Sequence, residues 1–211
     1  SERTQWMLKL REAVLENEHL LRSAIVYEMG KTYDAAWEDI EAVVNALEWY
    51  PNAMKNLRDE QIPDYENTHT HKMIQQPAGV AVAYLAWNFP LLNLGFKLGP
   101  ALASGCSIII KPSALSPLSA YILGKIIHDI DFPAGVVNIL SGPTSEVATT
   151  LSKSKIPAVL TMIGSTATGQ RVIADSATSI KKLSMELGGN APFIVFEDCL
   201  LYTSPSPRDR I

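Results

Sequence analysis

The sequence has little of what marks several large classes of protein. Its two cysteines, Cys106 and Cys199, are too few for a disulfide framework, and its four histidines show no metal-ligand spacing. A net charge of -4 leaves no basic excess to attract nucleic acid. No apolar run approaches the roughly 20 residues of a membrane span. We therefore expect no disulfide scaffold, no metal site, and no nucleic-acid or membrane partner.

The start of the sequence also lacks familiar features. Residues 1–4 contain neither an initiator Met nor the apolar segment of a signal peptide, so the N-terminus looks truncated. With only two scattered cysteines, a reducing, cytoplasmic setting is the default expectation. The remaining composition is ordinary: 211 residues, 47% hydrophobic and 19% charged, are enough for one sizeable core.

Apolar periodicity predicts a helical beginning. A first helix can be closed by Gly30, and a second over residues 33–49 is expected to end at Pro51. Residues 1–63 should therefore form an N-terminal helical part of the chain. Weak alternation within residues 64–78 predicts an extended strand, which we expect to be of the oligomerisation type.

From Val80 onward, strands alternate with helices. The strands are nearly continuous apolar runs, and strands without a polar side imply a parallel sheet covered by helices on both faces. We therefore predict an α/β fold with a Rossmann-like parallel sheet over residues 79–198, preceded by the N-terminal helical segment. The expected elements cover residues 80–86, 91–104, 107–110, 117–129, 136–140, 145–152, 159–163, 167–177 and 182–187.

The last segment, residues 199–211, breaks this pattern. It has two prolines and no hydrophobic period, and it reads like the translation of a transposon-type sequencing adapter. We expect it to be a non-native tail and exclude it from the fold. Cys199 is accordingly assigned no function.

Two polar side chains lie in short motifs where predicted strands end. Asn88 lies in Trp-Asn-Phe-Pro, and Glu186 precedes the glycine pair Gly188 and Gly189. Ligands of parallel sheets bind beyond the carboxyl ends of the strands. An amide N–H and a carboxylate are the groups needed to stabilise an oxyanion and to activate a water. The simpler alternatives are a turn asparagine that bonds its own backbone and a strand-end carboxylate that reaches water.

Two further segments could meet a dinucleotide. Lys111 follows the second alternating strand, where dinucleotide folds place the group that contacts the adenosine ribose; the alternative is a solvated lysine. The segment 164–169 joins a strand to a helix whose free N–H groups could meet a diphosphate. It has the glycine spacing of a P-loop, but Gln170 and Arg171 replace the required Lys-Ser/Thr, which disfavours a nucleoside triphosphatase. Cys106, without an activating neighbour, is expected to be an inert buried thiol.

Taken in order, residues 87–90, 110–113, 164–169 and 186–190 resemble the aldehyde dehydrogenase superfamily. The run around Glu186 looks most like the succinate-semialdehyde dehydrogenase branch. The resemblance implies that residues 79–198 form an NAD(P)-binding domain. The cofactor-binding positions that it implies are Ala86, Trp87, Lys111, Ser113, Ala114, Gly142, Gly164, Ser165, Leu187 and Gly188.

The resemblance also implies catalytic roles. Asn88 would donate its amide N–H to the oxyanion of a thiohemiacetal, and Glu186 would activate the water that hydrolyses a cysteine thioester. Apart from the resemblance, the apolar strand around Glu186 predicts that burial raises its pKa towards that of a useful general base. Ala114 stands where many members that prefer NAD carry a glutamate, so its presence favours NADP. Ile163 replaces the threonine usual in the family, and any contact from that hydroxyl is lost.

By this resemblance, the parent enzyme uses NADP or NAD to oxidise an aldehyde, with succinate semialdehyde as a candidate, and forms a homodimer or homotetramer. The sequence stops before the family's nucleophilic cysteine, so the catalytic domain is expected to be absent and the chain alone inactive. Two alternatives stay open. A CoA-acylating aldehyde dehydrogenase is disfavoured because that branch tends not to keep Glu186, and a non-catalytic cofactor-binding or structural homologue would lack a downstream cysteine.

Overall fold

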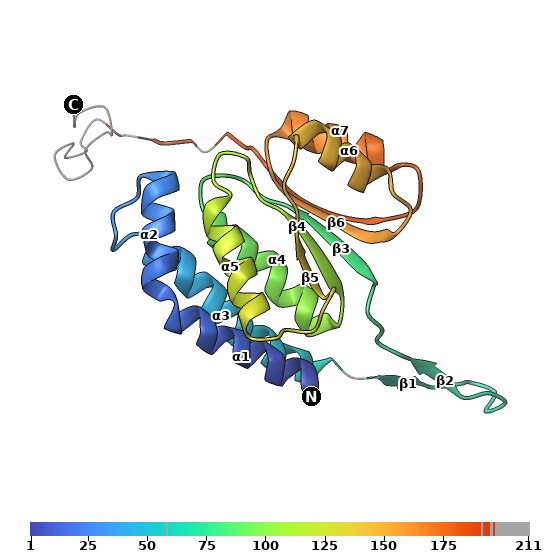
Figure 1. The fold of residues 1–211 in the computed structure, drawn as a ribbon. Coiled ribbons are helices and arrows are strands. Elements are labelled where there is room, and N and C mark those ends of the chain that lie inside the picture. The colour runs from blue at the N-terminus through green and yellow to red at the C-terminus, as the bar shows by residue number, and fades with distance from the viewer. Residues whose placement is uncertain (58, 191, 195, 197–211) are drawn as a thin grey trace.

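A computed structural model of the chain describes residues 1–57, 59–190, 192–194 and 196. Helices come first, strands and helices alternate after them, and a five-stranded parallel sheet lies at the centre (Figure 1), which confirms the predicted α/β class. The helices are α1 (Glu2–Glu16), α2 (Glu18–Met29), α3 (Trp37–Ala53), the 3-10 turn η1 (Met54–Asn56), α4 (Pro90–Ser104), α5 (Leu118–Asp129), α6 (Thr144–Lys153) and α7 (Thr166–Ser176). The strands are β1 (Glu60–Ile62), β2 (His71–Met73), β3 (Val80–Tyr84), β4 (Ser107–Lys111), β5 (Val137–Ile139), β6 (Pro157–Gly164) and β7 (Lys182–Leu187).

The N-terminal helices differ from the prediction in two details. The single first helix is split at Asn17, whose φ of -104° and ψ of 15° lie outside the helical region and whose Nδ2 donates to the carbonyl of Ala13 at 2.9 Å. Gly30 ends α2 with a φ of +70°, as predicted. Pro51 does not end α3, which continues to Ala53. A proline lacks one N–H donor and crowds the preceding turn, but it leaves helical dihedrals open to the residues that follow it, so α3 can continue for two more residues.

The strands β1 and β2 form a separate antiparallel pair that extends away from the body of the molecule (Figure 1). Within residues 64–78 only His71–Met73 is a strand, which is shorter than the predicted extended segment. Its partner β1 lies in the part that was expected to be helical. Every residue of both strands is exposed, so neither carries the apolar alternation that identifies a strand in a sequence.

The main sheet has the strand order β5-β4-β3-β6-β7, with all neighbouring strands parallel. Helices α4 and α5 cover one face, with α1, α2 and α3 packed outside them, and α6 and α7 cover the other face (Figure 1). This is the doubly wound Rossmann order. The order reverses between β3 and β6, which is the point where ligands of such sheets bind.

The centre of the sheet is buried on both faces. Along β3, Ala81 and Ala83 join the larger apolar core beneath α4, whereas Val82 and Tyr84 join the smaller core beneath α6 and α7. This two-residue alternation between two cores explains why the strand reads as a continuous apolar run. Among the helices that the structure describes, none combines the length and apolarity that crossing a membrane requires.

Helices α4 and α5 begin without a capping side chain of their own. Two carboxylates from the N-terminal helices take that role: Asp39 of α3 accepts the first N–H groups of α4, and Glu28 of α2 accepts those of α5. The helices α4 and α5 follow strands β3 and β4. The N-terminal helical part therefore fixes the loops at the carboxyl edge of the sheet.

Candidate functional site

The carboxyl edge of the main sheet collects the segments that the sequence motifs single out. Each of the five parallel strands contributes its following loop, and the reversal of strand order places the loops after β3 and β6 side by side. The residues brought to this edge are Ala86, Trp87 and Asn88 after β3, Lys111, Ser113 and Ala114 at the end of β4 and after it, Gly142 after β5, Gly164 and Ser165 after β6, and Glu186, Leu187 and Gly188 at the end of β7.

Asn88 is exposed at this edge, two residues before α4 begins. Its Oδ1 accepts a hydrogen bond from Nδ2 of Asn93, at 3.3 Å. This bond differs from the expected alternative, in which a turn asparagine bonds to its own backbone. Because the amide oxygen is engaged, the NH2 group of Asn88 faces away from Asn93. Asn88 can therefore present an N–H donor at the carboxyl edge.

The backbone around Asn88 is held by the loop after β4. The hydroxyl of Ser116, a fully buried residue, donates to the carbonyl of Trp87 at 3.0 Å. This carbonyl directly precedes Asn88 in the chain. Trp87 leaves more than half of its surface (54%) exposed, so its indole is available to a ligand.

The start of α4 is held by a buried ion pair. Asp39, which has no exposed surface, accepts from the backbone N–H groups of Leu91 and Leu92, each at 3.0 Å, and pairs with the ammonium of Lys31 at 2.6 Å. The same ammonium lies 3.4 Å from the centre of the Phe89 ring. A charge at the helix N-terminus and a cation against the neighbouring ring fix the backbone on the helical side of Asn88.

Glu186 is exposed, which corrects the expectation that it is buried. It lies on β7, the edge strand of the sheet, and in the described residues no further strand covers that edge. Lys97, which no sequence motif singled out, lies on α4 and is half-buried. Burial lowers the pKa of Lys97, and the negative charge of Glu186 acts in the opposite direction. The signal that could have found it is a single lysine within a strongly apolar helix.

Lys111 is buried, with 5% of its surface exposed, so the alternative of a solvated lysine is wrong. Its Nζ donates to the carbonyl of Pro112 at 3.1 Å, and burial lowers the pKa of the ammonium. Beside it, Ser113 Oγ accepts from the backbone N–H of Leu115 at 3.2 Å, whereas Ala114 is exposed. The ribose contact of Lys111 stays a prediction.

The N-terminal part of α7 packs closely against the end of β7 and the loop that follows it. Ser165 caps it by accepting from the backbone N–H of Thr168 at 3.3 Å. A Cβ on Gly169 would lie 2.7 Å from Leu187 Cδ2, so the glycine lets α7 pack directly on β7. A Cβ on Gly188 would lie 3.8 Å from Thr166 Oγ1, which places the loop after β7 beside the start of α7.

The backbone conformation and a close neighbour both favour glycine at position 142. Its φ is +145°, and a Cβ there would lie 2.8 Å from Val147 Cγ2. The edge therefore offers bare backbone at Gly142 and Gly188, hydroxyls and N–H groups at the start of α7, and the ammonium of Lys111. This donor set fits the diphosphate and ribose of a dinucleotide.

Cys106 lies at the other edge of the sheet, just before β4 begins. It is 7% exposed, and the hydroxyl of Ser104 lies 3.5 Å from its sulfur. The predicted buried thiol is confirmed. Cys199 lies outside the described residues, as does the rest of the segment 199–211.

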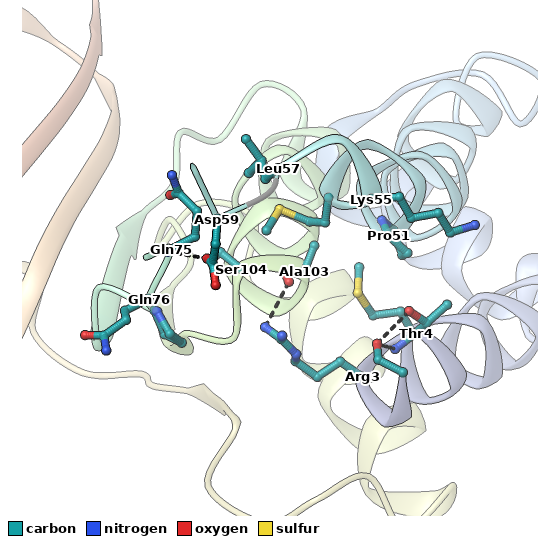
Figure 2. A pocket seen from close by; sticks show the side chains of 14 residues that line it. Arg3, Thr4, Pro51, Lys55, Leu57, Asp59, Gln75, Gln76, Ala103 and Ser104 are labelled. Carbon is teal, nitrogen blue, oxygen red and sulfur yellow. Dashed lines mark hydrogen bonds between the residues drawn. The ribbon is translucent and has the colours of Figure 1, made fainter. Parts of the chain in front are cut away.

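A cavity of about 470 Å³ also lies at the amino edge, between the start of α1 and the base of the β1–β2 pair (Figure 2). Polar groups in its wall bond to one another: Arg3 Nη1 donates to the carbonyl of Ala103, and the N–H of Gln75 donates to Asp59 Oδ1, each at 3.1 Å. None of the residues predicted to bind cofactor lines it. We therefore place the candidate site at the carboxyl edge.

Comparison with known proteins agrees with this geometry. The profile of the aldehyde dehydrogenase family matches residues 1–203. The glutarate-semialdehyde dehydrogenase of Pseudomonas putida is 36% identical over 93% of the chain and 41% of that protein, and the NADP(+) succinate-semialdehyde dehydrogenase of Escherichia coli is 36% identical over 88% and 38%.

Solved structures extend the likeness to the fold. A 3,6-anhydro-L-galactose dehydrogenase in complex with NAP has a TM-score of 0.89 and 34% identity. The succinate-semialdehyde dehydrogenase of Burkholderia pseudomallei has a TM-score of 0.89 and 33% identity. Each match covers 95% of the chain and 42% of the other protein. The chain thus spans about two fifths of the proteins that it matches.

Proposed function

The chain belongs to the aldehyde dehydrogenase family, and from this membership we propose that it is the cofactor-binding portion of an enzyme that oxidises an aldehyde to a carboxylate through a cysteine thioester. The observation that carries the proposal is the common position of Asn88 and Glu186. They follow or end β3 and β7, which flank β6 on either side, and both are exposed at the carboxyl edge. That edge also holds the N–H groups, hydroxyls and ammonium that fit a dinucleotide.

In the proposed reaction, Asn88 and Glu186 act at different steps. An N–H of Asn88 stabilises the oxyanion that forms when a cysteine attacks the aldehyde, and Glu186 removes a proton from the water that later attacks the thioester. When bound, NADP or NAD supplies the hydride acceptor. The attacking cysteine is proposed to come from a catalytic domain outside residues 1–211.

The cofactor preference is proposed from the residues after β4. Ala114 is exposed and uncharged where a carboxylate would repel a 2′-phosphate, and the ammonium of Lys111 ends the strand beside it. NADP should therefore be used at least as well as NAD. A relative described as NADP(+)-dependent and the complex with NAP support this preference.

The substrate class follows from the relatives. Several of them are semialdehyde dehydrogenases, so we propose a small aldehyde such as succinate semialdehyde as the substrate. The exposed β1–β2 pair offers unpaired strand edges, which suit a subunit contact in a homodimer or homotetramer. The free thiol of Cys106 accords with a reducing, cytoplasmic compartment.

The test uses the intact enzyme with succinate semialdehyde and either cofactor. Reduced cofactor and succinate should form in equal amounts without added CoA. Dependence on CoA, with an acyl-CoA product, would instead indicate the acylating branch. Absence of reduced cofactor with a panel of aldehydes would contradict the proposal and favour a non-catalytic homologue.

A further inference from the structure

We infer that Asn93 is a positioning residue for the oxyanion donor: its side chain holds the amide of Asn88 in the orientation that directs an N–H group to the reacting oxygen. The inference rests on the proposed function, because Asn93 acts only through Asn88. The contact that carries it is the hydrogen bond from Asn93 Nδ2 to Asn88 Oδ1, at 3.3 Å.

A donor on the oxygen of Asn88 selects one of two nearly isosteric orientations. The oxygen and the NH2 group of an asparagine differ little in size, so shape alone does not decide which of them faces a ligand. Asn93 is 5% exposed and donates from the protein side, whereas Asn88 is exposed. The oxygen therefore faces the protein, and the NH2 group is left for the carboxyl edge.

The other contacts of this segment hold the backbone around Asn88 but leave its side chain free to rotate. Ser116 holds the carbonyl before it, and Asp39 holds the N–H groups at the start of α4. Neither of these bonds reaches the amide of Asn88. A donor that is oriented before the reaction costs no reorganisation when the oxyanion forms, so fixing this last rotation contributes to the rate. The bond from Asn93 also polarises the amide and strengthens its N–H as a donor.

The composition of α4 supports a specific role for Asn93. Among the buried residues of this helix, all of which the structure describes, Asn93 is the single polar one; the others are Leu, Ala, Gly and Pro. Asparagine is a poor residue for a helix interior, and burying its amide is costly unless it is bonded. Asn88 is the side-chain partner that the structure gives it.

A double-mutant cycle in the intact enzyme tests the inference. Asn88→Ala should lower kcat about 100-fold or more, as the loss of one oxyanion donor does. Asn93→Met, which fills the site with a larger, flexible apolar side chain and removes the donor, should lower kcat about five- to tenfold with little change in KM. In the Asn88→Ala background, Asn93→Met should lower kcat less than about twofold, because its effect passes through Asn88. Leu102→Met, a buried change at the far end of α4, is the matched control and should leave kcat unchanged.

Each other outcome has a defined meaning. An equal loss from Asn93→Met in both backgrounds would overturn the inference, since the residue would then act on the fold. If Asn88→Ala leaves kcat unchanged, the proposed role of Asn88 fails and the inference about Asn93 fails with it. If Asn88→Ala lowers kcat and Asn93→Met does not, the inference about Asn93 alone fails. Should Asn93→Met not fold, Asn93→Thr, which is polar but too short to reach Asn88, replaces it in the same cycle.

A second measurement needs no turnover. In NMR spectra of the chain 1–211, the side-chain NH2 signals of Asn88 are those that disappear in Asn88→Ala. They should shift in Asn93→Met and stay in place in Leu102→Met. Unchanged Asn88 signals in a folded Asn93→Met variant would show that the bond is not formed and would overturn the inference.

Discussion

At the scale of single residues, the half-buried ammonium of Lys97 shows two opposing effects. Burial disfavours the charged form and lowers its pKa, whereas the negative charge of Glu186 favours the charged form. Burial is the larger effect. Because the folded-state pKa lies below the ordinary value of 10.5, the unfolded chain binds the proton more tightly. The contribution of Lys97 to the free energy of unfolding therefore rises with pH between the lowered pKa and that ordinary value.

Replacing Glu186 tests this coupling. Glu186→Gln removes the charge that favours the ammonium, so the pKa of Lys97 should fall further below its usual range. NMR titration of the Lys97 side chain in the chain 1–211 measures the change. Glu60→Gln, a neutralisation on β1, is the control and should leave the titration in place. An unchanged or higher pKa in Glu186→Gln would show that the two charges do not interact.

Ala114 is the position at which cofactor preference can be altered by one side chain. In the intact enzyme, Ala114→Glu places a carboxylate where we expect the 2′-phosphate of NADP. Like-charge repulsion should lower kcat/KM for NADP relative to NAD roughly five- to tenfold. Ala114→Gln adds the same bulk without the charge and should change the ratio much less. A strong preference of the unmodified enzyme for NAD would contradict the expectation.

At the scale of elements, the start of α5 depends on a side chain from another helix. The carboxylate of Glu28 accepts from the backbone N–H of Leu118 at 2.6 Å and of Ser119 at 3.2 Å, and also from the hydroxyl of Ser119. These bonds satisfy N–H groups that a helix leaves unpaired at its first turn. They join α2 to the end of the loop that follows Lys111 and carries Ala114.

Glu28→Ala removes this cap and should lower the free energy of unfolding by about 1–2 kcal/mol, as the loss of a helix cap does. Urea denaturation followed by circular dichroism should show a lower midpoint at an unchanged slope. Glu41→Ala, an exposed change on α3, is the control and should change the free energy of unfolding by no more than about 0.5 kcal/mol. Equal midpoints for the two variants would show that the bonds to α5 add no stability.

At the scale of the whole molecule, the two edges of the sheet separate Cys106 from the candidate site. Asn88 and Glu186 lie at the carboxyl edge, whereas Cys106 precedes β4 at the amino edge and is buried. Because parallel strands all point the same way, no rearrangement of a side chain brings that thiol to the other edge.

The chain 1–211 should therefore show no aldehyde oxidation with NADP or NAD, even when folded. Reduced cofactor is the quantity to measure, with succinate semialdehyde as the substrate. Cys106→Ser should make no difference to the result. Turnover that disappears in Cys106→Ser would refute the assignment of this cysteine as an inert thiol.

The sequence by itself determined the elements and the ends at which they carry polar residues. Apolar strands and their intervening helices are local patterns, and Asn88, Lys111 and Glu186 follow or end such strands, so their common edge could be predicted once the sheet was expected to be parallel. The same reasoning failed for β1, whose exposed residues carry no apolar alternation.

The tertiary structure alone decided how these pieces meet. The strand order, the caps from Asp39 and Glu28, the bond from Asn93 and the charge of Glu186 acting on Lys97 all join side chains that the local pattern treats as independent. Glu28 and Leu118 are 90 residues apart, and no sequence period relates them. The exposure of Glu186 is decided in the same way, because a strand buries its side chains only where another element covers it, and β7 lies at the edge of the described sheet.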